Sequence, residues 1–74
     1  MKVIVTGWKP GLQKVSMTRL ILDQSRLGLA ESKACTDRLL DGGTVEITML
    51  TRDAAESLAS DLNSINAIAH VEDG

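Results

Sequence analysis

The stretch KVSMTRLILDQSRLGLAESKA, residues 14–34, decides how this chain folds. Apolar residues recur at helical spacing over residues 12–25 and again over residues 29–40, which predicts two consecutive helices. Between them lies Gly28, and a glycine can take the left-handed backbone conformation that stops a helix. The stretch therefore predicts a helix pair joined by a tight turn.

Strand patterns lie on both sides of this helix pair. Residues 2–8, KVIVTGW, are β-branched and end before a Pro-Gly turn, and residues 44–49, TVEITM, alternate between apolar and polar side chains. Thr51 can cap a third helix, and a short apolar segment over residues 67–71, before a polar EDG tail, predicts a last strand. The order is β-α-α-β-α-β. We expect an α+β fold, a two-layer sandwich with three helices on one face of a three-stranded sheet.

Helical spacing also predicts which residues enter the core. Each helix has one apolar stripe that should face the sheet. We expect these stripes to consist of Met17, Leu20 and Ile21 in the first helix, Ser32, Cys35 and Leu39 in the second, and Ala55, Leu58, Leu62 and Ile65 in the third.

Two apolar residues of the first helix do not fit its core stripe. Val15 and Leu22 lie near the opposite side of the helix, with Arg19 between them in projection. Either the second helix covers both residues or they are exposed and form a docking patch. Periodicity favours the first alternative modestly.

Bulk properties narrow the class of protein. A chain of 74 residues is a single domain over residues 1–74, with a small core. Its one cysteine, Cys35, cannot form an internal disulfide, which fits a reducing compartment. The apolar run near the start, residues 3–5, is too short for a signal peptide or a membrane span. We expect a soluble, cytoplasmic protein without a membrane partner.

The charge is unevenly distributed along the chain. Residues 1–40 hold seven cations and three anions, a balance of +4, whereas residues 41–74 hold one cation and seven anions, a balance of −6, which together give the net charge of −2. Such a division predicts a polarised surface, unless the charges merely solvate exposed faces.

Residues 14–34 resemble the C-terminal domain of the bacterial ribosomal stalk protein. The shared features are the Lys14-Val15 pair that opens a helix, a basic residue five positions later at Arg19, the RLGL turn at 26–29 and the AESK run at 30–33. The segments DAAESLASDL and AIAHVE are similar to the family's third helix and last strand. The resemblance implies the same β-α-α-β-α-β fold.

The resemblance also implies a function. In that family the domain is not catalytic: it recruits translation GTPases through its first helix pair. The positions that match its contacts are Lys14, Val15, Arg19, Leu29 and Lys33. We add Leu22, which shares the exposed side of the first helix in the docking interpretation. Because the family's N-terminal dimerisation region and hinge are not in this sequence, we expect a monomer.

Little in the sequence indicates a catalytic, metal-binding or cofactor-binding site. His70 is the single histidine and has no nucleophile near it in sequence, and Cys35 is expected to be a buried, unreactive thiol. We see no spacing of metal ligands, no phosphate-binding loop and no cofactor motif. The single aromatic residue and the lack of a known motif argue against nucleic-acid binding. We therefore expect no catalytic residues and no enzyme.

Two functions remain open. The first is a protein-binding module that docks on a translation GTPase or a related protein through the basic helix pair. The second is an immunity protein or antitoxin that neutralises a cognate toxin by stoichiometric binding, which would suit a small domain with an acidic half.

Overall fold

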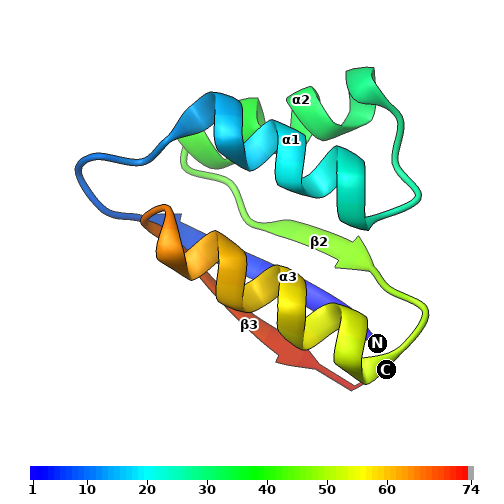
Figure 1. Ribbon diagram of the computed structural model, residues 1–74. Coiled ribbons are helices and arrows are strands. Elements are labelled where there is room, and N and C mark those ends of the chain that lie inside the picture. Colours follow the sequence, from blue (N-terminus) through cyan, green and yellow to red (C-terminus); the bar gives the residue numbers. More distant parts are fainter. Residues whose placement is uncertain (74) are drawn as a thin grey trace.

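The computed structural model describes residues 1–73; Gly74, the last residue of the expected polar tail, lies outside them. Figure 1 shows three helices packed against one three-stranded sheet. The elements follow the predicted order, with the bounds β1 Lys2–Trp8, α1 Lys14–Gln24, α2 Leu29–Leu40, β2 Val45–Thr48, α3 Arg52–Ser64 and β3 Ala67–Glu72. The α+β, two-layer prediction is confirmed.

The sheet is antiparallel, and β1 is its central strand. The strand order is β2-β1-β3, and Val3 of β1 lies between Ile47 of β2 and Val71 of β3. A bulge between Val5 and Gly7 shifts the register of the β1–β3 pair near one end. Val3 and Val5 of β1 are fully buried on the helix side, and Ile4 on the other face is only 7% exposed because side chains of both neighbouring strands flank it.

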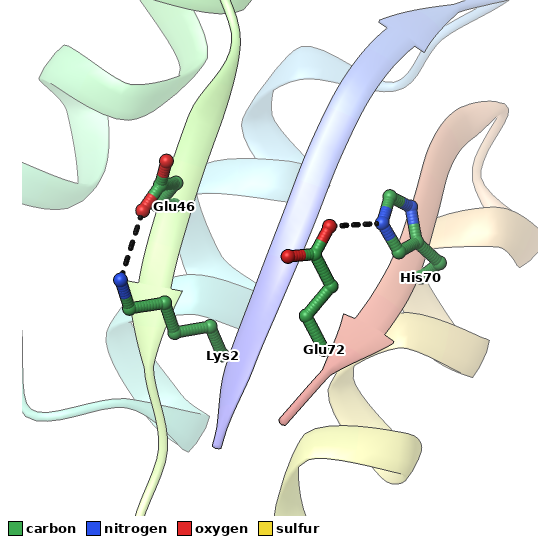
Figure 2. A network of polar contacts seen from close by, with 4 residues as sticks. All are labelled: Lys2, Glu46, His70 and Glu72. Atoms are coloured by element: carbon green, nitrogen blue, oxygen red, sulfur yellow. Dashed lines mark hydrogen bonds and ion pairs between the residues drawn. The ribbon is translucent and has the colours of Figure 1, made fainter. Parts of the chain in front are cut away.

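Alternation along the strands separates a buried face of the sheet from an open one. In β2, Val45 and Ile47 are buried whereas Glu46 and Thr48 are exposed, as the sequence pattern predicts. Figure 2 shows the polar side chains of the open face, where Lys2 pairs with Glu46 at 3.2 Å. The helices cover the other face.

The core lies between that buried face and the helices. Helix α3 packs against β3 and β1, α2 packs against β1 and β2, and α1 contacts both α2 and α3. The apolar stripe expected for α3 is buried along its whole length, and so are Met17 and Ile21 of α1. Leu20 is partly buried at the margin of the core rather than inside it.

Two local predictions were wrong. Gly28 does not take the left-handed conformation: its backbone is extended, with φ −76° and ψ 178°, and it is the residue that caps the N-terminus of α2. Cys35 is only partly buried, because the residues of α2 that face inward are Ser32, Thr36 and Leu39. Thr36 is buried although it was not among the residues expected in the stripe of the second helix.

The cap of the third helix agrees with the sequence. The Thr51 hydroxyl accepts a hydrogen bond from the Ala54 N–H at 3.1 Å, which satisfies one of the free donors of the first turn. After α3, Asn66 takes a positive φ of 76°, and asparagine tolerates this conformation better than most residues. Its conformation directs the chain into β3.

Candidate functional site

An open groove of about 300 Å³ runs between α1 and α2. The contributing positions recur every three or four residues in both helices, which places them on the facing flanks of the pair. We call this feature the α1–α2 groove; it is lined by Lys14, Val15, Thr18, Arg19 and Leu22 of α1 and by Leu29, Lys33, Thr36, Asp37 and Leu40 of α2.

All six residues named from the sequence line this groove. Lys14, Val15, Arg19 and Leu22 come from α1, and Leu29 and Lys33 come from α2. The two helices meet at the Gly28 turn and pack side by side, so that residues up to 19 positions apart in sequence share one surface. The fold therefore brings together what the sequence suggested separately.

Helix α2 shields Val15 and Leu22 to different extents. The helices do pack as a pair, yet Val15 remains 80% exposed, whereas Leu22 is partly buried. Leu29 is 63% exposed on the other wall of the groove. Two large aliphatic side chains thus face solvent along one groove.

The electrostatic character of the groove is positive. Lys14, Arg19 and Lys33 are exposed, and none of them forms an ion pair with another residue of 1–73. Asp37 is the single anion among the lining residues. Three cations that form no ion pair within residues 1–73 are free to bind an acidic surface, and they line the same groove as the exposed aliphatic side chains.

The floor of the groove is polar, which the sequence analysis missed. The Thr18 and Thr36 hydroxyl oxygens lie 2.8 Å apart and form a hydrogen bond between α1 and α2. Thr18 lies three positions after Val15, and Thr36 lies three positions after Lys33, so helical spacing contained the signal that would have found them. The bond joins the two walls of the groove.

The residues considered for chemistry lie elsewhere. The ring Nε2 of His70 is 2.9 Å from a Glu72 carboxylate oxygen on the open face of the sheet (Figure 2), and both side chains are exposed. Cys35 lies on α2, on the other side of the sheet. Desolvation is the main cause that raises the pKa of the Cys35 thiol. The charge of Arg38 lowers this pKa, and the charge of Glu31 raises it. The thiol and the imidazole are therefore not positioned to act together.

Two features are absent from the part of the chain that the structure describes. Within residues 1–73 there is no group of three His, Cys, Asp or Glu side chains able to hold a metal ion. Among the same residues no helix has the length and apolar character required to cross a membrane.

The fold and the groove define a small α+β domain with a basic, partly apolar surface between its first two helices. No protein-family model matches the chain, and neither the curated proteins nor the solved structures contain a match to it. The groove itself is therefore the feature of this protein that indicates a function.

Proposed function

We propose that the protein is a non-catalytic binding module that docks a protein partner through the α1–α2 groove. The observation that carries the proposal is the coincidence of exposed Val15 and Leu29 with three cations that form no ion pair within residues 1–73. Aliphatic side chains supply affinity through burial, and the surrounding charges supply orientation and association rate. The groove suits an acidic protein surface that projects an apolar side chain.

The resemblance to the ribosomal stalk domain supplies the kind of partner. A translation GTPase, or a related protein with an acidic docking surface, is the partner we propose for the groove. Cys35 has no disulfide partner in the chain, which supports a reducing, cytoplasmic setting for this interaction.

The alternative role, an immunity protein or antitoxin bound to a toxin, would use a different surface. The open sheet face and the acidic half present Glu46, Glu72 and Asp73, all exposed, which would suit a basic toxin. Because the two roles use opposite sides of the molecule, charge reversals distinguish them.

The test compares partner capture by matched charge-reversal variants of the whole chain. Arg19→Glu replaces an attraction beside the aliphatic residues with a repulsion, so it should weaken partner binding by about 2 kcal/mol or more. Its thermal stability should change little, because exposed charges contribute little to folding. Glu46→Lys, on the open sheet face, is the control and should bind the partner as the unaltered protein does.

The opposite pattern would reverse the proposal. If Glu46→Lys abolishes capture of the partner while Arg19→Glu retains it, the partner is bound by the sheet side. The inhibitor role would then replace the docking module as the proposed function.

A further inference from the structure

The two edges of the sheet are built differently. At the β3 edge the side chain of Asn63 imitates a neighbouring strand: its Nδ2 donates to the Ala69 carbonyl and its Oδ1 accepts from the Ala69 N–H, both at 2.9 Å. This double hydrogen bond occupies main-chain groups that would otherwise be free to pair with another strand. The β3 edge is therefore blocked at its middle.

The β2 edge has no such block. The Met49 N–H donates to the Met1 carbonyl at 2.8 Å, and Ile47 lies opposite Val3. Hydrogen bonds in an antiparallel pair involve every second residue, so the main-chain groups of Glu46 and Thr48 point away from β1. No other residue of 1–73 forms a hydrogen bond with these groups.

Two hollows lie beside this free edge. One, of about 270 Å³, lies between β2 and the outer flank of α2, where Glu31, Ala34 and Arg38 are among its lining residues. The other, of about 420 Å³, continues past Leu27 to Leu50, which is 73% exposed. The hollows share Leu27 and Glu46, so a second strand laid along β2 would have space on the helix side.

We propose that the β2 edge binds the β2 edge of a second copy of this chain, which joins the two sheets into one. In the antiparallel register centred on Ile47, Glu46 of each copy lies opposite Thr48 of the other. The outward main-chain groups of both residues then form four hydrogen bonds between the copies. The alternative register that places the two Glu46 side chains opposite each other is disfavoured by their like charges.

Charge complementarity on α2 identifies a second copy as the occupant. Glu31 and Arg38 lie on the flank of α2 that borders the β2 edge, and neither forms an ion pair within residues 1–73. A two-fold axis through the paired strands makes the two α2 helices antiparallel, so Glu31 of each copy approaches Arg38 of the other. Such a contact is self-complementary and closes at a dimer.

The dimer would leave the α1–α2 groove open. In α2 the groove residues Leu29, Lys33 and Leu40 lie about half a turn away from Glu31 and Arg38, since successive residues advance by about 100°. The two grooves would therefore lie on the outer sides of the dimer and engage two partner sites together, with a gain in avidity. This inference goes beyond the proposed function and replaces the monomer expected from the sequence.

The main test is sedimentation equilibrium of the whole chain from micromolar to millimolar concentration, without any partner. The unaltered protein should move from monomer towards dimer mass over this range, because β2 is short and the interface is small. Glu31→Arg alone and Arg38→Glu alone should each weaken association by about tenfold or more, since each brings like charges together twice. An equal mixture of the two variants should restore it, because every contact is again between opposite charges.

Two further variants control for charge and probe the strand contact. Asp23→Arg makes the same change of net charge as Glu31→Arg, on an exposed α1 position, and should dimerise as the unaltered protein does. Thr48→Pro deletes the outward N–H without removing a bond to β1, and proline is tolerated at such edge positions. It should weaken dimerisation by about tenfold, with circular dichroism to verify the fold.

The proposal is overturned if the unaltered protein stays monomeric at millimolar concentration. It is equally overturned if the mixture of charge variants associates no better than each variant alone. Association that Arg19→Glu abolishes, and that the mixture does not restore, would place the contact in the α1–α2 groove instead. None of these results depends on whether the groove binds a partner.

Discussion

The hydroxyl group of Thr18 on α1 is hydrogen-bonded to that of Thr36 on α2 at 2.8 Å, and this contact fixes the two helices relative to each other beneath the groove. Thr36 is only 3% exposed, so its hydroxyl has little access to water. A buried polar group that loses its partner is costly, which makes this pair a sensitive test of the helix packing.

A double-mutant cycle on this pair should be strongly non-additive. Thr18→Val leaves the buried Thr36 hydroxyl without its partner and should lower the free energy of unfolding by about 1–3 kcal/mol. Replacing both threonines by valine removes both polar groups and keeps their shapes, so the double variant should be close to the unaltered protein. Urea unfolding measures all four species; a loss in the double variant equal to the sum of the two single losses would show that the hydroxyl pair is not coupled.

Ser32 offers a stabilising substitution. Its side chain is fully buried, and its Oγ has no hydrogen-bond partner among residues 1–73. Ser32→Ala removes the unpaired hydroxyl and introduces a better helix former, so the free energy of unfolding should rise by about 1 kcal/mol. Ser57→Ala, at an exposed position of α3, is the control. Its stability should rise only by the smaller amount that comes from the higher helix propensity of alanine. A loss of stability in Ser32→Ala would indicate that the hydroxyl has a partner such as a buried water.

Substitutions of Val15 and Met17 should distinguish a residue of the docking surface from a residue of the core. Val15 is 80% exposed and Met17 is fully buried, although they are two residues apart on α1. Met17→Ala should cost about 2–5 kcal/mol of stability. Val15→Ala should change stability by less than about 0.5 kcal/mol while it weakens partner binding. Thermal unfolding and a binding titration check both; a large loss of stability in Val15→Ala would mean that α2 covers this residue.

Cys35 gives the protein a specific pH dependence. Burial raises the pKa of the thiol above its ordinary value, so the unfolded chain loses this proton at lower pH than the folded protein does. Stability from this group is present below the unfolded pKa and is lost as pH rises through the folded pKa. Between neutral pH and about pH 10, the free energy of unfolding should therefore decrease less in Cys35→Ala than in the unaltered protein.

The same thiol should react slowly at neutral pH, because the thiolate is the reactive form and a raised pKa makes it scarcer. Labelling with a small thiol reagent, compared with the unfolded chain at equal pH, measures this. Faster labelling of the folded protein would contradict the raised pKa.

Local sequence patterns were sufficient for the secondary structure. The alternation at Val45, Glu46 and Ile47 predicted which face of β2 is buried, and the Thr51 cap marked the start of α3. These features depend on residues near one another in the chain, where strand and helix periodicity act directly. The six candidate groove residues were also named from the sequence, although their meeting in one groove depends on how α1 packs against α2.

Only the tertiary structure decided features that depend on residues distant in sequence. Periodicity favoured a covered Val15, but the packing of α2 through Thr36 leaves it exposed; the same packing turns Cys35 partly outward. The strand order determined that β2 and β3 lie at the edges, and that Asn63 covers one edge while the other is free. A local pattern shows which side of an element is apolar, whereas the arrangement of its neighbours decides how much of that side loses contact with water.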